Sequence, residues 1–291
     1  MDILTNYTFQ IVALGSVLLA VAAAPVGAFS VYKGQSLIGD AIGHSTFPGI
    51  ILAYMAFATR SPVILLAGAI LAGAASYALI QLAHRDKRLG LDANLAIFLS
   101  GFFGLGMALK SFIQGNPDYA GASQAGLGTY IFGQAAYMLE ADVLLIAAIS
   151  ALVLTLLLLF YKELKLFVFD AEYAEVVGLP CRLLNLLLLV MTIAVIGIGI
   201  KAVGAILISS FLIIPCVAAN QWSNNFARVL LLSSLIGAVS ALVGTYISTL
   251  EQGMSTGPSI ILVTSLIAFF SIVFGTKGIL GSVLKRRRTH G

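Results

Sequence analysis

Charged residues are scarce in this chain of 291 residues. Asp, Glu, Lys and Arg make up 10% of it, whereas 60% is hydrophobic. A soluble domain carries about 25% charged residues, so this composition excludes a large soluble domain. We expect an all-α, polytopic membrane protein that forms one transmembrane domain over residues 1–291.

Cysteine is nearly absent, with Cys181 and Cys216 as the two examples. This excludes a disulfide framework and a cysteine-rich metal centre. The sequence has no Gly-x-x-x-x-Gly-Lys-Ser/Thr phosphate loop, so the chain does not bind ATP in that way, and no His-Glu-x-x-His, which argues against a zincin-type protease. Residues 1–30 lack a basic n-region, so we do not expect a cleaved signal peptide.

Apolar stretches of about 20 residues mark membrane spans. The expected spans are 8–31, 36–57, 61–83, 92–113, 142–161, 183–201, 203–220, 228–250 and 257–276. The hinges near Lys33 and Lys201 are short, which leaves the number of spans at eight or nine.

The positions of lysine and arginine predict the orientation. With nine spans and an external N-terminus, every Lys and Arg except Arg60, Lys110 and Lys201 falls on one side. Basic residues gather on the cytoplasmic side, so we expect a cytoplasmic C-terminus with a basic tail at 277–291. The formal charge of +4 then reflects topology rather than nucleic-acid binding. The connection 114–140 is expected to face outside and to contain a short helix or a re-entrant piece.

One cytoplasmic loop has the pattern of a short capped helix at about 170–179. Asp170 suits the N-cap and Glu172 the first turn, while Gly178 and Pro180 suit the C-terminal stop. Such a helix either docks on a partner or lies at the membrane surface, and the local pattern leaves both interpretations open.

Asp40 and His44 lie inside the second expected span. An Asp in hydrocarbon costs about 2.5–3.5 kcal/mol on insertion scales, and a spacing of four places both side chains on one helix face. The pair therefore predicts metal or proton handling. The alternative is a hydrogen-bonded pair that only tightens helix packing.

The residues around this pair favour a close helix contact. Gly39 and Gly43 form a small-xxx-small pair, and Pro48 deprives the carbonyl of His44 of its helical donor. In the seventh span, Pro215 has the same effect on a carbonyl there, and its neighbours Ser209 and Ser210 either line a pathway or pack between helices.

One carboxylate oxygen and one imidazole nitrogen suit manganese, iron, zinc or cobalt, whereas copper(I) prefers sulfur and magnesium or calcium prefers oxygen alone. Two ligands are too few for such an ion. A second copy of the chain across a two-fold axis would supply two more, and the alternative donors are Asp118 or Glu140 from the external loop.

Three segments resemble the permease subunits of ABC importers for zinc, manganese and iron. They are 39–49, which reads GDAIGHSTFPG, 169–180, which reads FDAEYAEVVGLP, and 203–215, which reads VGAILISSFLIIP. Their order and spacing also match, so the resemblance covers nearly the whole chain. One departure is Gly43, where relatives often carry serine, and we expect this difference to alter packing more than ligation.

The resemblance implies a cobalamin-importer-like (type II) permease fold in the bacterial cytoplasmic membrane. It implies a homodimer, two cytoplasmic ABC ATPase subunits and an extracellular or periplasmic metal-binding protein. Asp40 and His44 take the position of the family's metal ligands. The family's coupling helix falls on Asp170 to Leu179, with Glu172, Tyr173, Glu175 and Gly178 between them.

We therefore expect a transport subunit rather than an enzyme, with a transported divalent metal and no permanently bound cofactor. Manganese is the first choice of metal, and zinc or iron are the alternatives. From other classes, a membrane metalloenzyme could use Asp40 and His44, and a stand-alone secondary transporter would need an ion-coupling site beyond the single intramembrane acid.

Overall fold

The computed structural model describes residues 6–59, 61–84, 90–116, 119, 138–250 and 254–280. Its helices are α1 (Tyr7–Tyr32), α2 (Ile38–Phe57), α3 (Pro62–His84), α4 (Leu91–Gly115), α6 (Glu140–Leu159), α7 (Tyr161–Phe169), α8 (Ala171–Val176), α9 (Cys181–Val203), α10 (Ala205–Asn220), α11 (Phe226–Leu250) and α12 (Thr256–Phe274). The expected all-α fold is confirmed.

Seven of these helices are long and apolar enough to cross a membrane, and α10 is a shorter apolar helix. Together with α2, which carries the polar pair, they correspond one to one with the nine expected segments. The expected span 142–161 ends earlier than predicted, because the chain leaves regular helix at Phe160 and a separate helix, α7, follows. The prediction missed α7.

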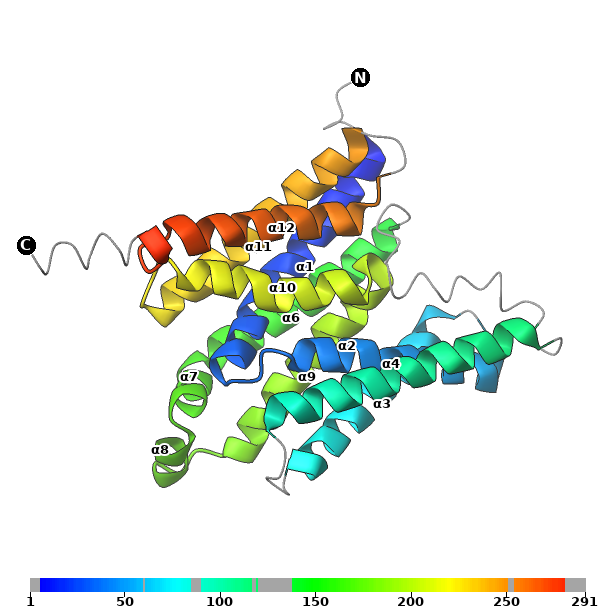
Figure 1. Ribbon diagram of the computed structural model, residues 1–291, viewed down its shortest axis with the longest axis horizontal. Helices are drawn as coiled ribbons and strands as arrows, with labels where there is room; N and C mark the ends of the chain where they lie inside the picture. Colours follow the sequence, from blue (N-terminus) through cyan, green and yellow to red (C-terminus); the bar gives the residue numbers. More distant parts are fainter. Residues whose placement is uncertain are drawn as a thin grey trace, which may run out of the picture.

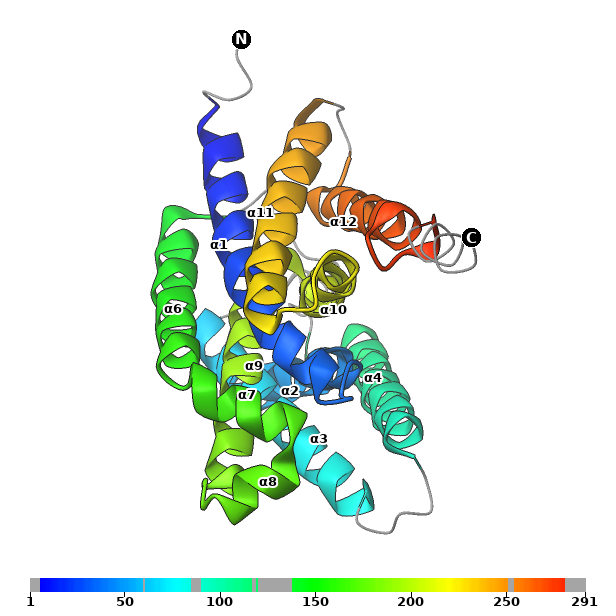
Figure 2. The same ribbon diagram turned by 90° about the vertical axis from the view of Figure 1, so that its left-hand side faces the viewer.

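Helix α1 runs through the middle of the molecule and packs against α6, α9, α10 and α11. Of its most apolar stretch, 78% is buried inside the chain. On one side of α1 lie α11 and α12, and on the other side lie α2, α3 and α4 (Figures 1 and 2). Helix α2 packs between α3, α4 and α10, so its polar pair lies close to three other helices.

Small residues allow these helices to approach closely. A Cβ added at Gly49 of α2 would lie 2.2 Å from the carbonyl oxygen of Gly68 in α3. A Cβ added at Gly27 of α1 would lie 1.9 Å from the carbonyl oxygen of Leu212 in α10. Since neither position has room for a side chain, backbone-to-backbone contact fixes α2 against α3 and α1 against α10.

Proline inside α1 leaves a carbonyl that another helix satisfies. Pro25 has no N–H, so the carbonyl of Val21 lacks its helical donor. The hydroxyl of Ser234 in α11 donates to this carbonyl at 3.2 Å. A free backbone acceptor would be costly in hydrocarbon, and this bond ties α11 to α1.

Candidate metal centre and coupling segment

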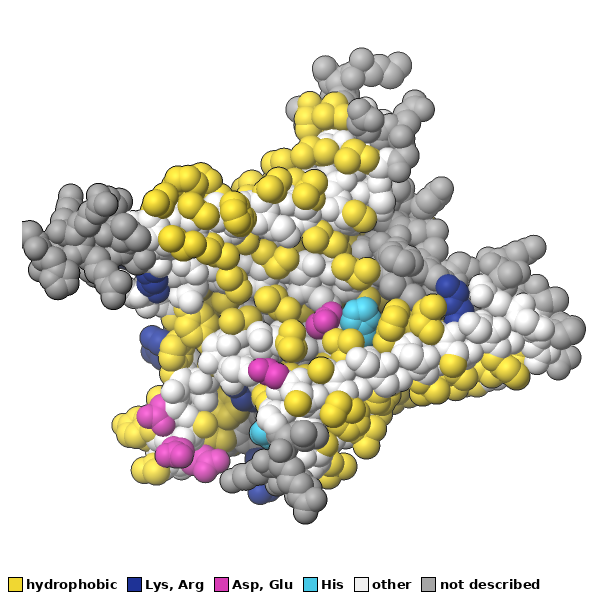
Figure 3. All heavy atoms as spheres, viewed as in Figure 1, with side chains coloured by type: hydrophobic (Ala, Val, Ile, Leu, Met, Phe, Trp, Pro, Cys, Tyr) yellow, Lys and Arg dark blue, Asp and Glu magenta, His cyan; other side chains and the backbone are white. Residues whose placement is uncertain are grey.

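Asp40 and His44 form a direct contact on α2. The Oδ1 atom of Asp40 lies 3.3 Å from Nε2 of His44, and 29% and 18% of the two side chains, respectively, is exposed. Figure 3 shows an acidic side chain and a histidine next to each other in the middle of one face, with apolar side chains around them. The pair is thus accessible from one side of the chain.

Two other helices contribute to the surroundings of the pair. The ring of Phe103 in α4 packs edge-on against the imidazole of His44, with centroids 5.0 Å apart. The hydroxyl of Ser209 in α10 lies near the Asp40 carboxylate, which could accept a hydrogen bond from it. The same hydroxyl lies 2.9 Å from the carbonyl of Ala205, and because it has one proton it can donate to one of these two acceptors at a time.

Sequence reasoning left the role of Ser209 open and did not connect it with Asp40. The structure brings the two together because α10 packs against α2. The adjacent Ser210 points elsewhere and donates to the carbonyl of Ile206 at 2.8 Å. A serine six residues before a proline in the same apolar span was the available signal, but it does not identify its partner.

The glycines of α2 contact α10 of the same chain. A Cβ added at Gly39 would lie 2.6 Å from Cδ1 of Leu212, and one added at Gly43 would lie 3.4 Å from Oγ of Ser209. The close neighbour that this glycine pair predicted is therefore an internal helix. On the other side of α2, Pro48 packs against Gly106 of α4, where an added Cβ would lie 3.1 Å from the proline ring.

Side-chain hydroxyl groups donate hydrogen bonds to backbone carbonyls of α2 near His44. Ser45 donates to the carbonyl of Ala41 at 2.6 Å and Thr46 donates to that of Gly43 at 2.6 Å. The hydroxyl of Ser45 also bonds to Ser76 of α3 at 2.7 Å. Pro48 removes the helical donor of the His44 carbonyl, so this acceptor lies on the same residue as the imidazole.

The described residues hold no group of three or more His, Cys, Asp or Glu side chains that could bind a metal ion. Of the alternative donors, Glu140 lies at the start of α6, where its carboxylate accepts a hydrogen bond from the hydroxyl of Tyr7. Asp118, most of the 114–140 connection and the basic residues 285–288 of the tail lie outside the described residues. One described chain therefore offers only Asp40 and His44.

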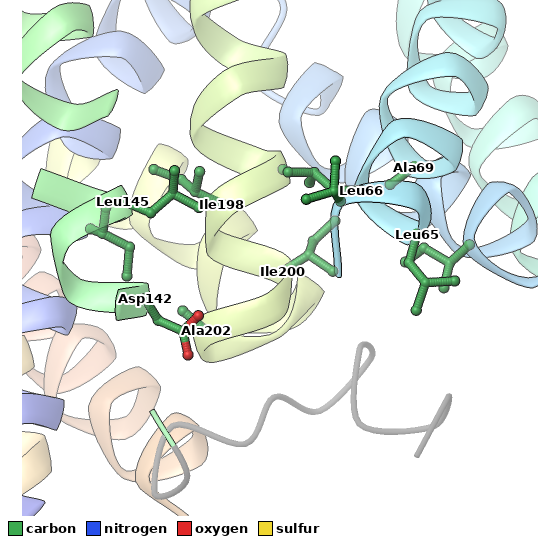
Figure 4. Close-up of a pocket in the computed structure, with 12 residues that line it drawn as sticks. Leu65, Leu66, Ala69, Asp142, Leu145, Ile198, Ile200 and Ala202 are labelled. Carbon is green, nitrogen blue, oxygen red and sulfur yellow. The ribbon is translucent and has the colours of Figure 1, made fainter. Parts of the chain in front are cut away.

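A separate cavity of about 70 Å³ lies between α3, α6 and α9. Its lining is almost entirely aliphatic, and the carboxylate of Asp142 is the only charged group on it (Figure 4). A lining without several oxygen or nitrogen donors does not bind a metal cation. The polar pair on α2, and not this cavity, is the candidate metal centre.

The structure has a short helix, α8, within the segment 170–179, and its caps are complete. The Asp170 carboxylate accepts from the backbone N–H of Tyr173 at 2.9 Å. At the other end, the N–H of Leu179 donates to the carbonyl of Ala174 at 3.0 Å, and Gly178 has φ +85°. This is a Schellman motif, which needs a left-handed residue that glycine provides without strain.

Helix α8 projects from one end of the molecule and buries only Ala174 (Figure 1). Its acidic residues Glu172 and Glu175 are exposed, as are 54% of Tyr173 and 83% of Val176. In Figure 3 acidic side chains gather at this end. A rigid helix that exposes both apolar and acidic side chains is suited to protein contact.

Comparison with known proteins extends these observations. The sequence pattern of the ABC 3 transport family matches residues 5–275. The chain is 39% identical to the zinc transport system membrane protein TroC of Treponema pallidum, over 99% of this chain and 96% of that protein. It is 38% identical to the manganese transport system membrane protein MntC of Bacillus subtilis, over 96% of this chain and 65% of that longer protein.

A solved structure has the same fold. PsaBC from Streptococcus pneumoniae in complex with Fab contains a chain that superposes with a TM-score of 0.81 at 26% identity, over 94% of both chains. The helical arrangement described above therefore recurs over nearly the full length of a known protein.

Proposed function

The chain belongs to the ABC 3 transport family, and from this premise we propose that it is the membrane permease of an ATP-driven importer of a divalent transition metal, with manganese as the first candidate. It is a transport subunit and a multi-pass membrane protein. The relatives named for zinc and for manganese are almost equally similar to it, so their names do not choose between the metals.

The observation that carries this proposal is the contact between Asp40 and His44 on a face of an apolar helix. One oxygen and one nitrogen donor suit manganese, iron and zinc. We place manganese first because the carboxylate makes the ligand set harder, with zinc and iron as alternatives. The metal is the transported substrate.

A second copy of the chain supplies the missing ligands in this proposal. These metals take four to six ligands, whereas one described chain offers two. A two-fold axis close to the pair would bring together two Asp and two His side chains from the two copies. The exposure of Asp40 and His44 on one face is compatible with this arrangement.

The properties of α4 support a dimer at this face. Among the seven long apolar helices, α4 has the lowest mean hydropathy, and 11% of its most apolar stretch is buried, against 28–78% for the other six. A helix surrounded by lipid is expected to be the most apolar, not the least. We therefore assign its exposed surface to protein contact.

The exposed surface of α4 also has the side chains for such a contact. Ala96, Ser100, Gly104 and Ala108 follow one another at intervals of four and are all exposed, and small residues at this spacing permit close helix packing in membranes. Helix α4 lies on one side of α2 and α10 on the other (Figures 1 and 2). A two-fold axis along the spans then brings α4 of one copy opposite α10 of its partner.

The motor is proposed to be a separate ATPase chain that receives α8. The chain has no phosphate loop of its own, and α8 is a capped, exposed helix with the features of a coupling helix. Two ATPase subunits bind the dimer in this proposal, one at each α8.

We propose the bacterial cytoplasmic membrane as the location, with the C-terminus and its basic tail on the cytoplasmic side. The 114–140 connection then faces outside and meets the protein that delivers the metal. A cysteine introduced at Ser123 is expected to react with an impermeant thiol reagent from the outer side of intact cells, and labelling restricted to the inner side would contradict the orientation.

Metal stoichiometry of the purified complex tests the function. After exposure to a mixture of manganese, zinc and iron, we expect one ion per two chains, lost in Asp40→Ala and in His44→Ala. Asp92→Asn, which changes an exposed acid in the first turn of α4, is the matched control and is expected to retain the ion. Two independent ions per dimer would contradict a shared site.

A further inference from the structure

A short turn between α1 and α2 holds a lysine in an unusual position. The ammonium group of Lys33 donates to the side-chain carbonyl of Asn185 in α9. The amide of Asn185 donates in turn to the hydroxyl of Tyr77 in α3 at 2.9 Å. The same ammonium lies 4.8 Å from the centre of the Phe167 ring in α7, a cation–π contact. One side chain thus joins the α1–α2 turn to α3, α7 and α9.

This arrangement is costly for stability. Burial lowers the pKa of Lys33 from 10.5 to about 8, and no described carboxylate forms an ion pair with it. A half-buried cation without an acid partner among the described residues is unfavourable, and an apolar side chain of similar length would fill the same space without that cost. A charged group retained at such a position needs an explanation other than packing.

The residue before Lys33 makes a parallel set of contacts. The ring of Tyr32 lies 5.3 Å from that of Phe169, the last residue of α7, and 5.0 Å from that of Phe226 in α11. The hydroxyl of Tyr32 donates to the side chain of Asn220 at the end of α10, at 2.9 Å. Tyr32 and Lys33 together therefore contact the segment that leads directly into α8.

Helix α2, which carries the Asp40–His44 pair, begins just after this turn, and α10, which packs against α2, ends at a residue that the turn contacts. Lys33 is seven residues before Asp40, and α2 starts between them at Ile38. Asn220, whose side chain accepts the hydrogen bond from Tyr32, ends helix α10, which carries Ser209 near Asp40. Contacts thus link α7 to the turn before α2 through Lys33 and to the end of α10 through Tyr32.

We propose that Lys33 is a positioning residue that transmits the movement of α8 to the Asp40–His44 pair by holding the α1–α2 turn against α3, α7 and α9. This inference rests on the proposed function, because it assumes that an ATPase moves α8. The hydrogen bond to Asn185 holds the turn against α9, and the cation–π contact with Phe167 links the same ammonium to α7.

The test compares transport with ATP hydrolysis in the complete complex. The permease is reconstituted in proteoliposomes with its ATPase and metal-delivery protein, and manganese uptake and phosphate release are measured together. For Lys33→Met we expect retained assembly, retained metal stoichiometry and retained hydrolysis, with uptake per ATP reduced about tenfold or more. Lys33→Arg keeps the charge and the donors and is expected to restore most of the ratio.

The control is Lys162→Met, which removes an exposed lysine from α7 and is expected to leave the ratio unchanged. If Lys33→Met does not assemble, Asn185→Leu, which removes the acceptor of the ammonium, provides the second variant and is expected to lower the same ratio. An unchanged ratio in either assembled variant would overturn the inference. A wild-type complex that neither binds nor transports metal would instead contradict the proposed function.

Discussion

The Asp40–His44 pair on α2 and the segment around α8, the proposed metal site and the proposed coupling helix, differ in how their interactions are completed. Helix α8 satisfies its ends with residues 170–179 of its own segment, through the Asp170 cap and the Schellman bonds at Gly178 and Leu179. The Asp40–His44 pair draws on α4 and α10 through Phe103 and Ser209 and in our proposal also on a second chain. A partner can dock on a preformed segment, whereas an ion site with missing ligands forms only on assembly.

The largest effect is expected from the ligands themselves. Asp40→Ala and His44→Ala each remove one of the two proposed ligands of a chain. Metal uptake in cells should therefore fall to the level of a strain without the transporter. The dimer and its ATPase should still co-purify, because neither side chain forms a described contact with a cytoplasmic segment. Uptake at the wild-type rate in both variants would show that the pair only stabilises helix packing.

The coupling segment is expected to respond differently. Replacing Glu172 and Glu175 by Arg inverts two exposed charges without affecting either cap, so membrane insertion and metal stoichiometry should survive while ATPase binding weakens. Pull-down of the ATPase chain and uptake per ATP measure the two parts of this expectation. Lys162→Glu, which inverts an exposed charge on α7, serves as control, and normal assembly with normal transport in the double variant would exclude docking through α8.

A substitution at one position of α4 tests the proposed dimer interface. Ala108→Leu introduces a larger side chain on the exposed face of α4, where overpacking costs about 1–3 kcal/mol and should weaken self-association correspondingly. Ala148→Leu makes the same change at an exposed position of α6 and should have no effect. Single-molecule photobleaching in liposomes measures the dimer fraction, and equal fractions for the two variants would place the interface elsewhere.

The smallest effect is expected at Ser209. Ser209→Ala removes a hydroxyl that can donate to the Asp40 carboxylate, and a typical hydrogen bond is worth about 0.5–1.5 kcal/mol, so manganese affinity should fall by about two- to tenfold while stoichiometry is unchanged. Ser210→Ala removes a hydroxyl that bonds to its own helix and should leave the affinity unchanged. Equilibrium metal titration of the purified dimer distinguishes the two, and equal affinities would show that Ser209 does not support the ligand.

Several structural features depend on residues that are close together in the sequence, and these features were predictable. The apolar stretches predicted the long helices, since each helix satisfies its own backbone in lipid. Asp170, Gly178 and Pro180 predicted the ends of α8 for the same reason, because a cap involves atoms only a few residues apart. The spacing of Asp40 and His44 predicted their contact, since four residues complete about one helical turn.

Other features depend on which helices meet, and the sequence did not reveal them. Lys33 and Asn185 are 152 positions apart, and no local pattern relates them. The lysine was interpreted only as a basic residue at a short hinge. Helix α7 was missed because the apolar segment before Phe160 continues smoothly into it. The sequence alone determined the long apolar helices, the Asp40–His44 contact and the caps of α8, because those interactions are local. Only the tertiary structure decided that α10 and α4 flank the pair and that the α1–α2 turn contacts α7, because these contacts depend on close packing between helices far apart in the chain.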